Sequence, residues 1–267
     1  MKLTIITPCF NSEKTIERTI KSVVNQKLSI NLEYIIIDGL SKDNTLNIIR
    51  RYAKKYDFIK YISEKDNSMT EALNKGLKMA TGDIITTINA DDEYLENSLN
   101  KICNKFIESE EKKIIIANTY FVYEETGDIK AKNKPKWFNP LLCGIIECPF
   151  PECSIFFRRE CFDRVGVFNE NIKYTQDLEL YLRMYESKYK FYYENIDVSN
   201  FYISSTNYSS TIMDKMEDEV VSYFKYKKIF RFFAHSTLSK IIKVVLGVRQ
   251  YRYKNIRINK LKCKVMM

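Results

Sequence analysis

The sequence predicts an α/β protein with a mixed, mostly parallel sheet, helices on both faces of that sheet, and a helical, basic C-terminal extension. Three observations support this prediction. Strand-like and helix-like patterns alternate through the first hundred residues. A near-continuous apolar run at residues 33–38 is typical of a strand that is buried on both faces. Residues 220–267 hold thirteen Lys and Arg but no Asp or Glu.

Apolar periodicity and helix-start signals define the first elements. The run Leu3–Thr7 is rich in β-branched residues and predicts a strand. Asn11 and Ser12 offer capping side chains for a helix that extends to about residue 26. Ser68 and Glu71 have the spacing of a capping box at the start of a later helix. By the same reasoning we expect strands over 33–38, 59–63, 84–88 and 114–117, and helices over about 44–56, 68–80 and 97–109.

The pattern loosens after Tyr123, where glycine and prolines separate shorter elements. We expect a hairpin and loops over 124–150, strands over 154–157 and 190–194, and helices over 159–165 and 178–187. From about residue 214 the sequence is again helical, with basic and aromatic residues interleaved. We therefore expect a main domain over 1–212 and a tail over 213–267.

The charge distribution separates a slightly acidic body from a basic tail. Residues 1–219 hold 30 basic and 34 acidic side chains, so the net charge of +9 comes entirely from the tail. This favours an enzyme with a surface-binding segment, and no nucleic-acid motif accompanies the charge. No run approaches the ~18 apolar residues of a membrane span, and no signal peptide is evident. We expect a cytoplasmic protein whose seven cysteines are reduced thiols.

Acidic side chains follow three of the first four predicted strands. Asp38 ends the second strand, Asp66 follows the third, and Asp91 and Asp92 follow the fourth. Open α/β sheets bind ligands beyond the carboxyl ends of their strands. Converging carboxylates repel one another, and a hard divalent ion bound to carboxylate oxygens and a diphosphate would compensate their charge.

No phosphate-binding glycine loop accompanies these acids. The sequence contains neither G-x-x-x-x-G-K-[ST] nor G-x-G-x-x-G after a strand. A P-loop enzyme and a dinucleotide-binding domain are therefore both disfavoured. A nucleotide bound at this edge would need a metal at Asp91 and Asp92 to neutralise its diphosphate.

Several segments together resemble the family 2 glycosyltransferases of the GT-A fold. They match in order and spacing along about residues 3–95, and a weaker match continues through 154–159 and 175–180. The segments of the main match are Ile6–Asn11, Ile37–Thr45, Ala72–Gly76, Ala80–Asp83 and Asn89–Asp92. The resemblance implies a Rossmann-type GT-A domain, with a nucleotide-sugar half at about 1–95 and an acceptor half at about 96–212.

The resemblance implies that a sugar is transferred with inversion from a nucleoside-diphosphate sugar, with a UDP-sugar favoured, to a glycan or lipid-linked acceptor. It places Thr7 by the nucleotide, Asp38 at the base, and Asp66 near the base or ribose. Asp91 and Asp92 would contact the ribose and the diphosphate-bound Mg²⁺ or Mn²⁺. The metal would then act as a Lewis acid for the leaving diphosphate.

The resemblance also makes Asp177 the candidate general base. Inversion by direct displacement needs a carboxylate opposite the leaving group, where it can take a proton from the acceptor hydroxyl. The family commonly has a Glu-Asp pair here, whereas this chain has Gln176-Asp177. One acid is kept, and Glu179 is the alternative base.

Two further positions depart from the family pattern. Glu152-Cys153-Ser154 stands where many relatives have a His-Gln-Ser-like segment, so a contribution of that segment to metal or acceptor binding is left open. Asn89 stands where many relatives have Asp, which leaves Asp91 and Asp92 as the expected metal ligands.

Simpler roles stand beside these. Asp38 could be a turn residue before Gly39, and Asp177 an ordinary helix-start residue. Trp137 could stack on a sugar acceptor or anchor a loop. His235 is expected to be a packed or surface residue. The tail, residues 220–267, is expected either to bind an anionic membrane surface or to form a solvated extension or homodimer contact.

Two functions from other classes are alternatives. A sugar-phosphate nucleotidylyltransferase would use a similar sheet, but it would need a basic, glycine-rich loop after the first strand. Residues 9–13 do not supply that loop. A non-catalytic scaffold that binds nucleotide or membrane is the second alternative.

Overall fold

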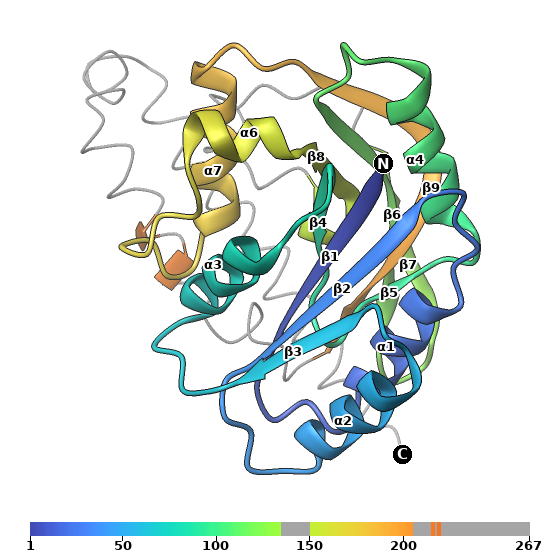
Figure 1. Cartoon of the computed structure of the whole chain (residues 1–267), viewed down its shortest axis with the longest axis vertical. Helices are drawn as coiled ribbons and strands as arrows, with labels where there is room; N and C mark the ends of the chain where they lie inside the picture. Colours follow the sequence, from blue (N-terminus) through green and yellow to red (C-terminus); the bar gives the residue numbers. More distant parts are fainter. Residues whose placement is uncertain (135–149, 205–214, 217, 220–267) are drawn as a thin grey trace, which may run out of the picture.

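A mixed sheet forms the centre of the computed structural model, which describes residues 1–134, 150–204, 215, 216, 218 and 219 (Figure 1). The strands are β1 (Lys2–Cys9), β2 (Asn31–Asp38), β3 (Ile59–Ser63), β4 (Ile84–Thr87), β5 (Glu93–Tyr94), β6 (Ile114–Tyr123), β7 (Ile129–Asn133), β8 (Ile155–Arg158) and β9 (Phe191–Ile203). The helices are α1 (Ile16–Val24), α2 (Thr45–Lys55), α3 (Met69–Met79), α4 (Ser98–Glu108), the 3-10 turn η1 (Glu152–Ser154), α6 (Arg159–Val165) and α7 (Gln176–Glu186).

The strand order is β3-β2-β1-β4-β8-β6-β9-β5, with β7 paired to β6. The four strands of the predicted βα repeat, β1 to β4, pair in parallel. The rest of the described sheet is mainly antiparallel, although β6 and β9 are parallel neighbours. The predicted mixed, mostly parallel sheet is therefore confirmed: β1 to β4, β6 and β9 run in one direction, and β5, β7 and β8 run in the other.

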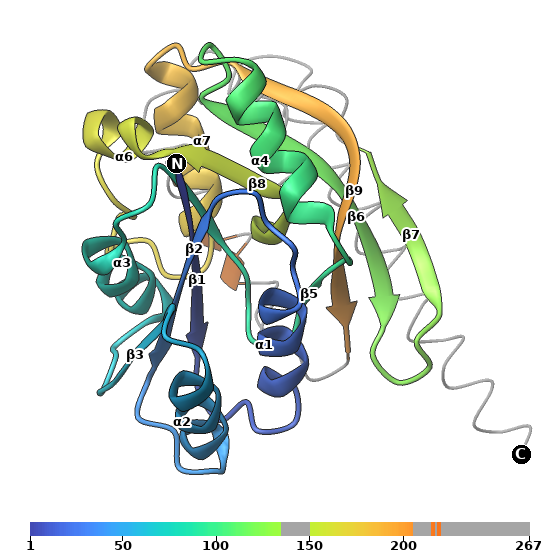
Figure 2. The ribbon, with the colours of Figure 1, turned by 45° about the vertical axis from the view of Figure 1, so that its right-hand side comes forward.

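Helices cover both faces of the sheet (Figure 2), and a hydrophobic cluster lies on each face. Alternate side chains of a strand point to opposite faces. In β2, Tyr34 and Ile36 accordingly pack with α1, α2 and α4, while Ile35 and Ile37 pack with α3, α6 and α7. Because both faces of β2 are covered, residues 33–38 lack the polar alternation of a strand with one exposed face. The predicted helices on both faces of the sheet are confirmed.

The first helix begins later than the sequence predicts. Its first residue is Ile16, and neither Asn11 nor Ser12 caps it with a side chain. Asn11 instead has a left-handed backbone (φ 50°), and its Oδ1 accepts a hydrogen bond from the Lys42 N–H at 2.9 Å. The loop after β1 is thereby joined to the loop after β2, and the helix starts once the chain has left this junction.

The strands β6 and β9 extend well beyond the predicted runs of 114–117 and 190–194. Polar residues interrupt their later parts, so the sequence did not show the full strands. The polar side chains pair with one another across the ladder: Asn118 Nδ2 donates to Asp197 at 2.8 Å, and the Thr119 and Ser199 hydroxyls lie 3.0 Å apart. A buried polar group that is hydrogen-bonded does not oppose strand formation.

The structure also bears on the predicted helix cap, the cysteines and membrane-spanning helices, while several residues considered above lie outside the described part of the chain. Ser68 caps α3 by accepting from the Glu71 N–H at 3.2 Å. The described cysteines, Cys9, Cys103, Cys153 and Cys161, are free and buried. No helix in the described ranges is long and apolar enough to cross a bilayer. Trp137, Cys143, Cys148, His235 and the basic tail at 220–267 lie outside the described residues.

Candidate active site

The carboxyl ends of β1, β2 and β3 lie side by side. Cys9 is paired with Asp38, and Asp38 with Ser63, so the segments that follow these strands leave one edge of the sheet. The strand β4 is parallel to β1 and delivers the turn with Asp91 and Asp92 to the same edge. The structure thus assembles the acids that the sequence placed after separate strands.

Asp38 and Thr7 already bond to the protein. Asp38 is fully buried, and its carboxylate accepts hydrogen bonds from the N–H and hydroxyl of Ser41 and from the Ser63 hydroxyl, the last at 2.6 Å. The buried Thr7 hydroxyl lies 3.1 Å from the Tyr34 hydroxyl. Both side chains are therefore already bonded inside the edge of the sheet, and Asp38 holds the loop that follows β2.

Asp66 has one oxygen in an ion pair and one without a partner. Its Oδ1 lies 2.6 Å from Lys75 Nζ, and Lys75 also contacts Glu64 and Glu71. Its Oδ2 is buried without a hydrogen-bond partner, close to Gly39 at the end of β2. Burial raises the pKa of Asp66, while Lys75 acts in the opposite direction. Oδ2 is thus an acceptor available to a ligand N–H or hydroxyl beside the strand ends.

The backbone of the Asp91–Asp92 turn is held by the helix α1. Arg18 donates from Nη2 to the Asp91 carbonyl at 2.6 Å, and Thr19 donates from its hydroxyl to the Asp92 carbonyl at 2.7 Å. Arg18 also pairs with Glu124, and its guanidinium lies 3.6 Å from the centroid of the Tyr202 ring. An Arg that is bonded and stacked at once has little freedom, so it fixes the turn firmly.

The side chain of Asp92 is buried, with 1% of its surface exposed. Its Oδ1 accepts from the Tyr202 N–H at 3.0 Å, and its Oδ2 faces Asn89 Nδ2 at 3.4 Å. Burial and then the charge of Asp91 raise the pKa of Asp92 well above its usual value. Burial also raises the pKa of Asp91. The carboxylates of Asp91 and Asp92 therefore form a site where burial and mutual repulsion disfavour their negative charge, which a bound cation would stabilise.

The chemistry of this turn fits a hard divalent cation. The turn holds the carboxylates of Asp91 and Asp92 and, beside them, Asn89 Oδ1, a buried oxygen that has no hydrogen-bond partner. Oxygen ligands of this kind suit Mg²⁺ or Mn²⁺. No group of three or more His, Cys, Asp or Glu that could hold a metal occurs in the described part of the chain. The remaining ligands would thus come from a bound diphosphate and water.

Glu152 is a buried acid whose role the sequence left open. It lies in η1, between the Thr87 hydroxyl at 3.5 Å and Gln176 Nε2 at 3.3 Å. Burial and then the charge of Asp177 raise the pKa of Glu152 to about 8. Glu152 is also among the charges that raise the pKa of Asp92. Glu152 thus links the Asp91–Asp92 turn to the helix α7. Its sequence signals were its place in a segment that departs from the family pattern and its position as a lone acid within 149–157.

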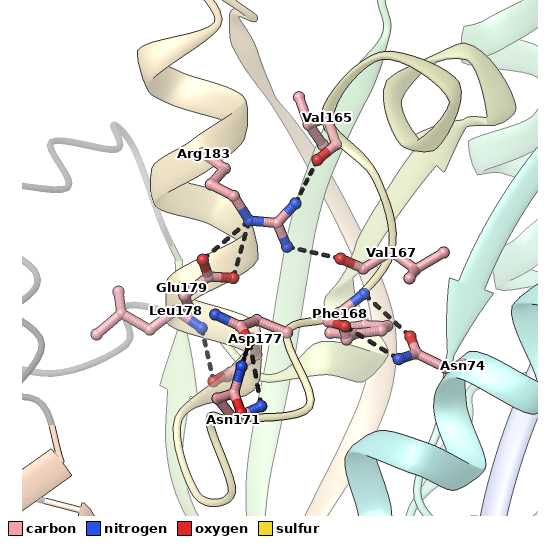
Figure 3. Close-up of polar contacts among 10 residues, drawn as sticks. Asn74, Val165, Val167, Phe168, Asn171, Asp177, Leu178, Glu179 and Arg183 are labelled. Carbon is pink, nitrogen blue, oxygen red and sulfur yellow. Dashed lines mark hydrogen bonds and ion pairs between the residues drawn. The ribbon is translucent and has the colours of Figure 1, made fainter.

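Asp177 is the second residue of α7, and its carboxylate accepts a hydrogen bond from the Leu178 N–H at 2.7 Å (Figure 3). Its charge acts on Glu152, which places it at the same acidic centre. The alternative base, Glu179, is buried, and both of its oxygens lie 2.9 Å from Arg183 Nε. Arg183 in turn donates to the Val165 and Val167 carbonyls. Glu179 therefore helps to hold the preceding loop through Arg183, and Asp177 stays the candidate base.

Replacing Glu152 with Gln is expected to stabilise the protein at alkaline pH. The pKa of Glu152 is about 8 in the folded chain and about 4.5 ordinarily, so the folded state binds this proton more tightly. The wild type therefore loses stability as pH rises from about 4.5 to about 8. At pH 9 the free energy of unfolding of the variant should exceed that of the wild type by about 2–4 kcal/mol.

Urea denaturation at pH 5 and pH 9 measures this difference. Glu125→Gln is the matched control, because Glu125 is exposed and should show no such pH dependence. A Glu152→Gln effect of equal size at both pH values would contradict the raised pKa.

A model of glycosyl transferase family 2 matches residues 4–169. The chain belongs to glycosyl transferase family 2. The resemblance seen in the strand-end motifs is thereby confirmed. Membership of this glycosyltransferase family also counts against the nucleotidylyltransferase and scaffold alternatives.

Relatives and solved structures agree with the family. The chain is 32% identical to the cholesterol galactosyltransferase of Borreliella burgdorferi over 143 residues. The matched stretch covers 54% of this chain and 39% of that protein. The chain spans 31% or 39% of the length of three curated relatives that it matches.

Two structures of nucleotide-sugar complexes share its fold. Residues 1–349 of TarS from S. aureus, in complex with UDP-GlcNAc, match with a TM-score of 0.64 at 18% identity, over 90% of this chain and 77% of that one. The mannosyltransferase PcManGT from Pyrobaculum calidifontis, in complex with GDP-Man and Mn²⁺, matches with a TM-score of 0.60 at 16% identity, over 80% of this chain and 60% of that one. These likenesses confirm the GT-A-like fold of the family 2 domain.

Proposed function

We propose that the chain is an inverting glycosyltransferase that moves a sugar from a nucleoside-diphosphate sugar, with a UDP-sugar as first candidate, to a glycan or lipid-linked acceptor. The main support is that family 2 membership coincides with a series of acids across the strand ends. Asp91 raises the pKa of Asp92, and Asp177 raises that of Glu152. Perturbed acids that gather at the ligand-binding edge of an α/β sheet are typical of an active site.

The donor side would be formed by the loops after β1, β2 and β3. Asp66 Oδ2, which is buried and unpartnered, is the side-chain acceptor best placed for a base or ribose group. Thr7 and Asp38 are proposed to border the nucleotide. Because their side chains bond to Tyr34, Ser41 and Ser63, their contacts would come from the backbone or from a shared carboxylate oxygen.

Asp91 and Asp92 are proposed to hold a Mg²⁺ or Mn²⁺, with Asn89 Oδ1 as a neighbouring oxygen. Such an ion supplies Lewis-acid stabilisation of the leaving diphosphate. The donor complex of the mannosyltransferase with Mn²⁺ supports this proposal at the level of the fold. The bonds from Arg18 and Thr19 would keep the two carboxylates oriented as the negative charge on the diphosphate grows.

Asp177 is proposed to take the proton of the acceptor hydroxyl. The acceptor oxygen bonds to the anomeric carbon, the bond from that carbon to the diphosphate breaks, and the proton passes to the Asp177 carboxylate. With its pKa of about 8, Glu152 is mainly neutral at pH 7. A neutral Glu152 adds no negative charge beside Asp177.

The basic tail is proposed to dock on an anionic membrane surface on the cytoplasmic side. Basic side chains near anionic lipids contribute about 1 kcal/mol each, and residues 220–267 hold thirteen of them. Docking would bring the site to lipid-linked acceptors. A contact between two copies of the chain through the tail is the alternative.

A panel of UDP-, GDP- and dTDP-sugars with Mn²⁺ tests the donor assignment. A donor present at about 100 times its Kd should stabilise the folded chain by about 2.7 kcal/mol, which corresponds to a rise in Tm of roughly 5–10 °C. Differential scanning fluorimetry measures the rise, and EDTA should remove most of it. If no donor in a broad panel raises the Tm or is hydrolysed, the proposed function is contradicted.

A further inference from the structure

Glu219 forms a dense set of hydrogen bonds at the start of α7. Its carboxylate accepts from the backbone N–H groups of Lys173, Tyr174 and Thr175 at 2.7, 2.9 and 2.8 Å, and from the Thr175 hydroxyl at 2.9 Å. Oε1 accepts from Lys173, and Oε2 accepts the other three hydrogen bonds. In Figure 1 the short coloured piece that contains Glu219 lies beside the loop before α7.

These donors are groups that the helix cannot satisfy by itself. The first N–H groups of an α-helix and those just before it have no acceptor within the helix. Thr175 is the N-cap residue of α7; its side chain does not cap the helix, and its hydroxyl donates to Glu219. The negative charge of Glu219 also matches the positive end of the helix dipole. A residue 44 positions later in the chain therefore holds the segment that leads into α7.

The same loop is tied to the donor half of the domain from its other side. The side chain of Asn74, on α3, bonds to both the N–H and the carbonyl of Phe168 at 3.0 Å (Figure 3). Thr70, also on α3, donates to the Ile172 carbonyl at 2.9 Å. The loop that leads to Asp177 is thus held between α3 and Glu219. Of these anchors, Glu219 is the one that contacts the residues immediately before Asp177.

A second contact joins the segment of Glu219 to the loop. Lys215 Nζ lies 5.9 Å from the centroid of the Tyr174 ring, a cation–π distance. The main domain was expected to end near residue 212, yet these contacts lie beyond that point. Lys215 and Glu219 therefore both contact the loop that leads into α7.

We propose that Glu219 is a positioning residue that fixes the first turn of α7 and thereby orients the carboxylate of Asp177 toward the acceptor hydroxyl. The proposal rests on the proposed role of Asp177 as the base. It assigns to the start of the C-terminal segment a task in the transfer step, separate from donor binding and from the basic charges that follow residue 219. A shift of the base by about 1 Å lowers turnover on the order of a hundredfold.

The test is a double-mutant cycle with Glu219→Gln and Asp177→Asn in the full-length chain. Gln keeps the shape of Glu219 but removes its charge and one acceptor, so kcat for transfer should fall roughly 10- to 100-fold, while KM for the donor should change less than about threefold. In the Asp177→Asn background the same substitution should have almost no further effect on kcat, because the carboxylate that Glu219 positions is already absent. Glu219→Asp should recover part of the lost kcat.

Asp218→Asn is the matched control, since Asp218 is the exposed neighbour of Glu219. Hydrogen exchange of the 173–175 amides should be faster in Glu219→Gln than in this control. Equal kcat in Glu219→Gln and Asp218→Asn would overturn the inference, as would equal losses from Glu219→Gln in both backgrounds. Full activity of Asp177→Asn would instead overturn the proposed base, and with it the inference, so the two failures are distinguishable.

Discussion

The Asp92→Asn variant is expected to lose turnover on the order of a thousandfold, while it folds at least as stably as the wild type. The loss follows because the amide cannot supply the negative charge that a divalent cation and the leaving diphosphate require. A thousandfold loss corresponds to about 4 kcal/mol of transition-state stabilisation. Initial rates of sugar transfer at several Mn²⁺ concentrations measure it, and added Mn²⁺ should not restore the rate.

The retained stability has its own physical reason. Burial and Asp91 raise the pKa of Asp92, so the folded wild type loses stability as pH rises above the ordinary pKa of an aspartate, about 3.8. An amide at position 92 does not ionise and escapes this loss. Its oxygen can still accept from the Tyr202 N–H, and its NH₂ group can donate to Asn89 Oδ1, which is unpartnered in the wild type, once the Asn89 amide rotates.

A matched control separates this effect from general damage. Asp57→Asn changes the same chemical group at an exposed turn between α2 and β3, far along the chain from the acidic turn, and should leave both rate and Tm unchanged. A catalytically active Asp92→Asn variant would remove Asp92 from the metal assignment. An inactive variant with a strongly lowered Tm would show that Asp92 serves folding rather than chemistry.

The Asp177→Asn variant is expected to lower kcat by about 10²–10⁴-fold with an almost unchanged Kd for the donor. Positioned proton transfer contributes this range, and the proposed donor site at the ends of β1 to β3 does not include α7. The amide can still accept from the Leu178 N–H through its oxygen, so the helix start should be preserved. Steady-state kinetics together with donor titration by calorimetry measure the two quantities separately.

Removal of the Asp177 charge should also act on Glu152. That charge is the second cause, after burial, of the raised pKa of Glu152, so the pKa should fall in the variant. The pH at which Glu152 ionises would then move toward its ordinary value. A variant that keeps wild-type kcat, or that loses donor affinity as strongly as turnover, would contradict the assignment of Asp177 as the base.

The sequence predicted the N-terminal half of the fold because its signals are local. Apolar runs, breaker residues and helix periodicity locate β1 to β4 and the helices between them within a few residues. The strands β6 and β9 were underestimated because their outer residues are polar. Asn118 and Asp197 become compatible with a strand only when each meets the other, across 79 positions of sequence.

The residues of the candidate site also differ in whether a local sequence signal marks them. Asp38, Asp66, Asp91 and Asp92 could be identified because each follows a strand, and the parallel sheet brings strand ends to one edge. Glu152 could not be assigned, because its environment comes from Thr87 and Gln176, which are distant in sequence. The role of Glu219 was hidden for the same reason: an acid just before a basic tail has no local pattern that marks it as a cap.

The hydrogen bond from the Tyr202 N–H to Asp92 has a consequence for how the protein folds during synthesis. It joins positions that are 110 residues apart, and the ion pair of Arg18 with Glu124 joins positions that are 106 apart. Contacts of such high sequence separation form late, because a long loop must close first. The Asp91–Asp92 turn should therefore reach its final geometry only after β9 has left the ribosome. A nascent chain of the first hundred residues would then hold a nearly complete parallel sheet and an unfinished acidic turn.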